Sequence, residues 1–265
     1  MKAFDSVERT ALWEILLKIS CPTDFVTIIC SFHEGTWASV IENCEVSPDF
    51  EVTNGTKQGC GLAPLLNVIF FSMMLRVAFL DCNLGIPICY RTDGDLFDLR
   101  RLQAATKVQT AIIRDLLFAD DCVLVAHTAT ALQTLFTQFI NSAKRFGLTV
   151  SLKKTETMSQ SYPLSPASTV TVMAGESQLA PVNRFCYLGS YLSNTISVDI
   201  DINSHLAKAG DAFGKLQRRL WGEYSIALLM KTAVYQAVVL SMLLYGCESW
   251  VLCRHSVRRL DEFHI

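Results

Sequence analysis

The chain has 265 residues, of which 51% are hydrophobic and 18% charged, so it can bury a sizeable core and is not intrinsically disordered. The formal net charge of −2 excludes a global positive field for nucleic acid, so any basic surface must be local. The 10 cysteines form no C-x-x-C pair, which fits neither a disulfide scaffold nor a standard zinc site; we expect reduced thiols in an intracellular protein of the nucleus or cytoplasm.

The first part of the chain predicts a helix followed by a hairpin. A capping-box arrangement at residues 5–8 precedes apolar residues at helical spacing, which predicts a helix over residues 6–19. Alternating and β-branched residues at 37–41 and 50–53 are typical of a hairpin or of short strands. The Asn-Gly pair at 54–55 closes this segment as a turn.

Two long apolar stretches, residues 68–80 and 232–247, predict buried helices. Both are shorter than the roughly 20 residues that a membrane helix needs, so we expect no membrane partner. The first stretch belongs to a helix that follows Pro64 and ends near residue 80. The polar residues 90–101 then predict a loop.

A pair of acids interrupts two apolar strands in the middle of the chain. Residues 116–119 and 122–125 predict the strands, and Asp120 and Asp121 lie between them. A two-residue connection normally needs Asn-Gly or another glycine-containing pair, and adjacent carboxylates repel each other. A broken local rule of this kind indicates a functional site. Because acidic pairs are also common at solvated turns, the pair alone leaves both interpretations open.

The second half predicts further helices and strands in an α+β chain. We expect a helix over residues 132–146 ending at Gly147, a strand over 148–152 that leads to Lys153 and Lys154, a strand over 185–192 interrupted by Gly189, a Ser/Pro-rich loop over 159–168, and two final helices over 202–220 and 225–245. The change from strands to helices near residues 194–201 predicts a domain boundary, with domains at 1–198 and 199–265.

Several motifs in a fixed order resemble those of reverse transcriptases from LINE-type non-LTR retrotransposons. Phe118 to Asp121 resembles the F/Y-x-D-D box of these enzymes. The other similar segments are residues 2–7, 54–64, 147–156, 187–190 and 244–250, followed by Phe263 and His264. The resemblance covers nearly the whole chain and implies a polymerase-type palm, in which helices pack on an antiparallel sheet, followed by a small helical thumb, with most of the fingers missing.

The resemblance also implies a reaction and a cofactor. A palm of this family extends a primer 3′-hydroxyl on an RNA template by two-metal nucleotidyl transfer, so DNA primer, RNA template and deoxynucleoside triphosphates are the implied partners. Asp120 and Asp121 would be the catalytic metal ligands, for Mg²⁺ or alternatively Mn²⁺. The oligomeric state does not follow from the sequence.

Other site residues carry over by position. Phe4 resembles the bulky residue under the sugar that excludes a ribose 2′-hydroxyl, with core packing as the alternative. Gln58 and Gly59 resemble a nucleotide and template contact, with a plain helix start as the alternative. Lys154 matches the basic residue near the triphosphate, whereas we expect Lys153 to be solvated.

Two further groups of residues are candidates for binding nucleic acid. Tyr187, Leu188 and Gly189 resemble the primer grip, where a glycine lets the strand approach the primer backbone. Residues 201–265 hold eight Lys or Arg against six acids. Lys215, Arg218 and Arg219 would share a helical face that contacts phosphates, unless this face is only solvated.

One departure from the family pattern bears on activity. The first motif of the family reads Asp-x-x-Lys-Ala-Phe-Asp, and its leading Asp would lie two places before Met1. Asp5 is the second acid of that pattern, and we interpret it as a helix N-cap rather than a metal ligand. We therefore expect a truncated copy with impaired catalysis. The alternatives are a catalytically dead remnant that binds nucleic acid and a pseudogene product without function.

Overall fold

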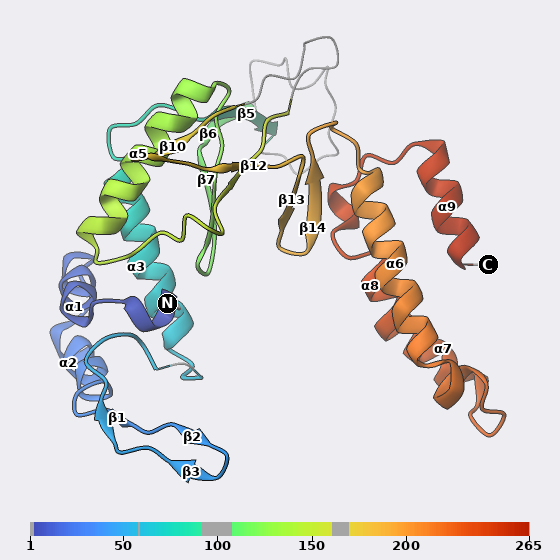
Figure 1. The fold of residues 1–265 in the computed structure, drawn as a ribbon, viewed down its shortest axis with the longest axis horizontal. Coiled ribbons are helices and arrows are strands. Elements are labelled where there is room, and N and C mark those ends of the chain that lie inside the picture. The colour runs from blue at the N-terminus through green and yellow to red at the C-terminus, as the bar shows by residue number, and fades with distance from the viewer. Residues whose placement is uncertain (1–2, 58, 92–107, 161–169, 265) are drawn as a thin grey trace. The chain divides into compact units, whose positions relative to one another are not determined.

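The computed structural model describes residues 3–57, 59–91, 108–160 and 170–264, and shows helices joined by short strands (Figure 1). The α+β class is therefore confirmed. Packing divides the chain into two compact units. The first is Met1–Leu152 with Val172–Gln178, and the second is Lys153–Thr171 with Leu179–Ile265. The functional division at residues 198 and 199 stays a prediction.

In its described residues the first unit contains the helices α1 (Arg9–Lys18), α2 (Thr23–Ser31), α3 (Ala63–Ala78) and α5 (Ala129–Arg145). They bury a continuous apolar core, whose fully buried members include Leu12, Phe70 and Leu135. Helices α3 and α5 pack against each other, and the Ser142 hydroxyl donates to the carbonyl oxygen of Met74 at 2.8 Å. As predicted, α5 is followed by a glycine, Gly147, with a left-handed φ of 71°.

The predicted capping box is wrong. Helix α1 begins at Arg9, Glu8 occupies the N-cap without a side-chain cap, and residues Ala3–Ser6 form a 3₁₀ turn. The reason is a tertiary one: the carbonyl oxygens of this segment accept hydrogen bonds from a distant loop, Phe4 from the Thr56 N–H and Val7 from the Gly55 N–H. This pairing fixes the backbone before the helix and overrides the local capping preference.

Strands of the first unit pair as short antiparallel hairpins. The pairs are β1 (Trp37–Ala38) with β4 (Phe50–Glu51), β2 (Ile41–Glu42) with β3 (Glu45–Val46), β5 (Ile86–Arg91) with β6 (Val108–Ile113), β7 (Asp115–Phe118) with β8 (Asp121–Leu124), and β10 (Met173–Ala174) with β11 (Ser177–Gln178). The hairpin predicted between residues 37 and 53 is confirmed. Within the described residues every sheet has two strands, so a continuous palm sheet stays a prediction.

The second unit joins small strands to a helical region. Strand β9 (Glu156–Thr157) runs parallel to β12 (Ala180–Pro181), and β13 (Arg184–Tyr187) pairs antiparallel with β14 (Ser190–Ser193). The helices are α6 (Asp199–Lys215), α7 (Leu228–Val234), α8 (Ser241–Leu243) and α9 (Arg254–His264), with π-helical segments at Gln217–Trp221 and Tyr235–Leu240 and a 3₁₀ turn at Cys247–Ser249. Helix α6 packs on α8, α9 and β14.

Three predictions for the second half need correction. Residues 148–152 form no strand, because the Leu148 N–H donates to the Ala143 carbonyl at the end of α5 and its side chain packs into the core. The predicted strand at 185–192 is instead a hairpin that turns at Leu188 and Gly189. A third helix, α9, follows the two that the sequence predicted. Its sequence is too polar for its few apolar residues to stand out as a stripe.

The predicted loops are only partly described. Tyr90 and Arg91 belong to strand β5 rather than to a loop, because they pair with Gln109 and Val108. The rest of that predicted loop, and most of the Ser/Pro-rich loop at 159–168, lie outside the described residues. No helix in the described part of the chain combines the length and apolar character needed to cross a membrane. All ten cysteines carry free thiols.

Candidate functional site

The two adjacent acids lie at the end of the β7–β8 hairpin. The register pairs Phe118 with Asp121, so the two-residue connection consists of Ala119 and Asp120 rather than of the two acids. Asp121 is the first residue of β8. Ala119 has a φ of 51°, a left-handed conformation that costs an L-residue roughly 1–2 kcal/mol. Backbone strain of this kind clusters at functional sites, where the surrounding structure maintains a conformation that is unfavourable by itself.

The hairpin is anchored at its base and open at its end. Leu117, Cys122 and Leu124 pack against the core of the first unit. Asp120 and Asp121 are both exposed, and Phe118 is 59% exposed. The arrangement therefore presents two carboxylates to solvent from a rigid support, as a site for a charged ligand requires.

Burial changes the ionisation of the groups below the acids. It raises the pKa of the Asp115 carboxyl, an effect that the neighbouring Arg114 partly opposes. Burial, with the Asp115 charge as a second cause, raises the pKa of the Cys122 thiol to about 12. Cys122 is therefore neutral near pH 7 and adds no charge beside Asp121.

The donor set fits a divalent cation of the magnesium type. Mg²⁺ takes hard oxygen ligands and is commonly held by one or two carboxylates, with waters and substrate phosphates completing its shell. Asp120 and Asp121 supply two such carboxylates at adjacent positions. In the described ranges no cluster of three or more His, Cys, Asp or Glu side chains is placed to hold a metal. The pair thus suits one ion whose shell the substrate completes, and the described residues assemble no third carboxylate for a second ion.

A second cluster joins the N-terminal segment to the loop before α3. Besides the two backbone bonds to Phe4 and Val7, the Arg9 guanidinium donates to the carbonyl oxygens of Gly55 at 2.9 Å and His33 at 2.6 Å. Gly55 is buried with a φ of 82°. The Phe4 backbone therefore lies directly against residues 55 and 56 of the segment that resembles a nucleotide-contacting motif.

The same segment is tied to α3 by a buried amide. Asn67 donates to the Thr56 hydroxyl at 2.6 Å and to the Ala63 carbonyl at 2.7 Å. Gly59 is exposed with a φ of 83° and with open space where a Cβ would be, so a ligand can approach its backbone. Gln58 lies outside the described residues. The partly buried Phe4 side chain leaves both its interpretations, sugar contact and packing, open.

The remaining predicted residues belong to the second unit. Lys153 and Lys154 are exposed in a turn that precedes β9. Tyr187, Leu188 and Gly189 form the end of β13 and the turn into β14. Both turn residues are left-handed, with φ values of 51° at Leu188 and 90° at Gly189, as type I′ hairpin turns require.

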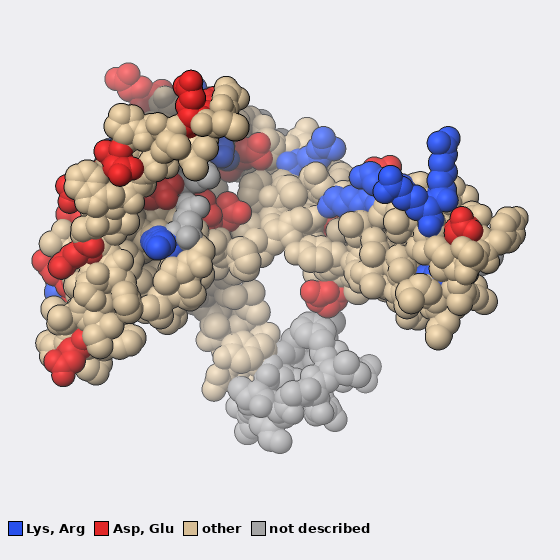
Figure 2. Space-filling view, turned by 90° about the horizontal axis from the view of Figure 1, so that it is seen from below, with Lys and Arg blue, Asp and Glu red and all other residues tan. Residues whose placement is uncertain are grey.

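Basic side chains gather on the second unit. Lys215 is the last residue of α6, and Arg218 and Arg219 lie in the π-helical segment after it; all three are exposed. Figure 2 shows Lys and Arg side chains along one edge of this unit, whereas acids predominate on the visible face of the first. The overall charge of −2 thus conceals a local positive surface.

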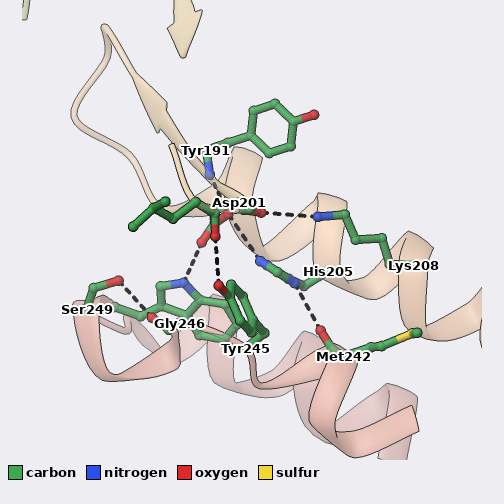
Figure 3. Close-up of polar contacts among 11 residues, drawn as sticks. Tyr191, Asp201, His205, Lys208, Met242, Tyr245, Gly246 and Ser249 are labelled. Atoms are coloured by element: carbon green, nitrogen blue, oxygen red, sulfur yellow. Dashed lines mark hydrogen bonds and ion pairs between the residues drawn. The ribbon is translucent and has the colours of Figure 1, made fainter. Parts of the chain in front are cut away.

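Sequence reasoning did not predict that three side chains contact the Leu188–Gly189 turn and the strand after it. They are Asp201, Lys208 and Tyr245, from α6 and from the segment after α8 (Figure 3). Asp201 lies beside Ile202 on the buried face of α6, but Ser204 and His205 one turn later are also polar, so no apolar pattern marks the acid as buried. Its partners are distant in the sequence, so the contact itself could not be read from the local pattern.

Glycine in place of Ala119 is expected to stabilise the protein by about 1 kcal/mol, because glycine adopts a left-handed φ without the steric cost that alanine bears. Urea unfolding followed by circular dichroism measures the change. The control is Ala207→Gly in the middle of α6, which should destabilise by about 1 kcal/mol. Destabilisation of similar size at both positions would contradict the strained turn.

Two comparisons with known proteins agree on one group. The sequence profile of the family described as "Reverse transcriptase (RNA-dependent DNA polymerase)" matches residues 1–192. The chain is also similar to the retrovirus-related Pol polyprotein from type-2 retrotransposable element R2DM of Drosophila melanogaster, with 26% identity over 271 residues. That alignment covers 97% of this chain and 23% of the polyprotein, so the chain spans less than a quarter of the length of this relative.

Proposed function

The chain belongs to the reverse transcriptase family, and from that premise we propose that it is the part of a non-LTR retrotransposon polymerase that copies RNA into DNA. The observation that carries the proposal is the exposed pair Asp120 and Asp121 at the end of a core-anchored hairpin, within the segment that the family profile matches. Residues 1–198 would act as the palm with partial fingers, and residues 199–265 as a thumb-like region.

The proposed reaction joins a primer 3′-hydroxyl to the α-phosphate of a deoxynucleoside triphosphate and releases pyrophosphate. Asp120 and Asp121 would hold the divalent cation, preferably Mg²⁺. A bound ion of this kind stabilises negative charge on the phosphate and lowers the pKa of a coordinated hydroxyl. The role of the protein would be to hold both carboxylates in fixed positions. The pairing of Phe118 with Asp121 supports this role, because it fixes the backbone at the end of the hairpin.

Other residues are proposed to bind the substrates. Phe4 would lie under the deoxyribose, an assignment supported by its backbone contact with Thr56. Gly59, with Gln58, would let the nucleotide and template approach the backbone, and the open space at Gly59 supports this. Lys154 would face the triphosphate, where its exposed ammonium can stabilise the leaving pyrophosphate.

Primer and template would be held mainly by the second unit. Leu188 and Gly189, with Tyr187 before them, would contact the primer end. Lys215, Arg218 and Arg219 would bind phosphates of the duplex, since all three are exposed on a locally basic surface. These contacts are independent of sequence, as a polymerase that copies any template requires.

Primer extension tests the proposed function. The purified chain, given an RNA template with an annealed DNA primer, deoxynucleotides and Mg²⁺, is expected to lengthen the primer, and chelation of the metal should stop the reaction. A DNA template of the same sequence shows whether RNA is preferred. Incorporation no greater than that of a mock preparation would contradict a catalytic role.

A second candidate function is duplex binding without catalysis. The described residues contain no cluster of three or more His, Cys, Asp or Glu side chains that could hold a metal. Two carboxylates alone would then have to hold both ions of a two-metal reaction, and this favours binding without catalysis. This candidate predicts that the chain binds primer–template in a salt-sensitive manner and that binding survives Asp121→Asn, because the phosphate contacts lie elsewhere. Fluorescence anisotropy at several salt concentrations decides it; no binding even at low salt would exclude it.

A further inference from the structure

The Leu188–Gly189 turn is held by side chains that are far away in the sequence. The Tyr245 hydroxyl donates to the carbonyl oxygen of Leu188 at 2.8 Å. The Lys208 ammonium donates to the carbonyl oxygen of Gly189 at 3.1 Å. Both carbonyl oxygens of the turn thus accept hydrogen bonds from the helical region. These bonds hold the turn backbone against α6 and the segment after α8 (Figure 3).

A buried carboxylate holds the strand that follows the turn. Asp201, which is 3% exposed, accepts the Tyr191 N–H at Oδ1 and the Trp250 indole N–H at Oδ2, each at 2.7 Å. The Nε2 atom of His205 lies 3.3 Å from Oδ1, and its Nδ1 lies 2.9 Å from the Met242 carbonyl oxygen. One carboxylate therefore connects β14, α6 and the segment after α8, and the histidine extends the network to α8 (Figure 3).

Close packing reinforces these hydrogen bonds. A Cβ at Gly189 would lie 3.2 Å from the ring of Tyr245, and a Cβ at Gly246 would lie 2.7 Å from the Ser190 hydroxyl. An added Cβ would therefore force the Tyr245 ring or the Ser190 side chain to shift, and both glycines also have a left-handed φ that favours glycine, 90° at Gly189 and 73° at Gly246. The two segments thus pack at two points: Gly189 lies against the ring of Tyr245, and Gly246 lies against Ser190.

We propose that Tyr245 and Asp201 are positioning residues for the Leu188–Gly189 turn, and that they fix the backbone against which the primer end is held. The identity of the ligand rests on the proposed function, whereas the fixing of the turn does not. The two residues act differently. Tyr245 restrains the turn itself, and Asp201 restrains β14 immediately after it.

The decisive variant is Tyr245→Phe, which removes one hydroxyl and keeps the ring against Gly189. Tyr235→Phe is the matched control, because the Tyr235 hydroxyl pairs with His264 Nδ1 at 3.0 Å in the same helical region and does not contact the turn. The loss of one hydrogen bond of about 1 kcal/mol should raise amide hydrogen exchange at residues 188–191 about fivefold in Tyr245→Phe. The control should leave exchange at these residues unchanged.

Asp201→Asn is the second variant. Asparagine offers one acceptor atom where aspartate offers two, so either the Tyr191 N–H or the Trp250 N–H loses its partner. Whichever of the two donors loses its partner, the Tyr191 amide or the Trp250 indole, should exchange its hydrogen at least about tenfold faster, because an unpaired buried donor costs more than a lost hydrogen bond. Should Asp201→Asn fail to fold, Tyr245→Phe still decides the proposal.

Steady-state primer extension supplies a readout that a purely structural role would not move. In Tyr245→Phe the KM for primer–template should rise severalfold, with the KM for deoxynucleotide and the midpoint of thermal unfolding as in Tyr235→Phe. Faster exchange in a chain that synthesises no DNA would overturn the proposed function but support the positioning of the turn. DNA synthesis with exchange and primer KM equal in the two variants would overturn the positioning role and leave the proposed function standing.

Discussion

Asparagine in place of Asp120 is expected to lower magnesium-dependent DNA synthesis at least about a hundredfold, without lowering the free energy of unfolding. The two effects separate because the carboxylate is exposed and lies next to a second one. It contributes no packing, and its removal relieves the repulsion between adjacent like charges. Asp121→Asn should behave in the same way. Primer extension measures the first effect and urea unfolding the second.

The matched control is Asp49→Asn, which removes another exposed acid from a loop of the same unit. It should retain the synthesis rate of the unaltered chain. Equal rates in Asp120→Asn and Asp49→Asn would show that the hairpin acids have no part in the reaction. Loss of activity together with a large loss of stability would instead assign Asp120 a structural role.

Alanine in place of Gly55 is expected to destabilise the first unit by about 3 kcal/mol or more. Its Cβ would lie 2.8 Å from the Asp5 Cα and 2.9 Å from the Phe4 carbonyl oxygen, which are backbone atoms that cannot rotate away. The φ of 82° adds a conformational cost. The N-terminal segment would separate from the loop before α3, so DNA synthesis should also fall.

Gly35→Ala separates these two causes. Gly35 has a φ of 58°, but a Cβ there would meet nothing within 4 Å, so this variant bears the conformational cost alone, about 1 kcal/mol. Denaturant unfolding of the two variants under the same conditions gives the difference. Equal destabilisation would mean that Gly55 is required for its conformation only and that the contact with Phe4 and Asp5 has little energetic weight.

The sequence predicted the elements whose pattern is strong within one segment. The apolar stripe that ends at Gly147 identified α5, and Pro64 before a long apolar run identified α3. Elements that depend on distant partners were missed or misplaced. Asp5 resembles a helix cap in sequence, but the bonds from Gly55 and Thr56 to the preceding turn decide where α1 begins. Helix α2 was missed because nine residues give too short a period to recognise.

The residues of the candidate site could be predicted from the sequence, but the contacts that hold them in place could not. The resemblance to LINE-type reverse transcriptases, which rests on Phe118 to Asp121 and the other ordered motifs, is confirmed by the family match. The two adjacent acids between apolar strands correctly predicted the end of a hairpin, but the observed register makes Asp121 the first residue of β8 rather than part of the connection. The bond from Tyr245 to Leu188 joins residues 57 positions apart, and nothing local to either residue indicates it.

Manganese titration followed by NMR tests most directly whether the hairpin acids are the chemical centre. Paramagnetic Mn²⁺ replaces Mg²⁺ at oxygen sites and broadens the signals of nearby amides. At low Mn²⁺ the signals of Asp120, Asp121 and their neighbours Ala119 and Cys122 should be lost first, and the double variant Asp120→Asn with Asp121→Asn should keep them. Broadening that begins at other acids and leaves the hairpin signals unchanged would contradict the account.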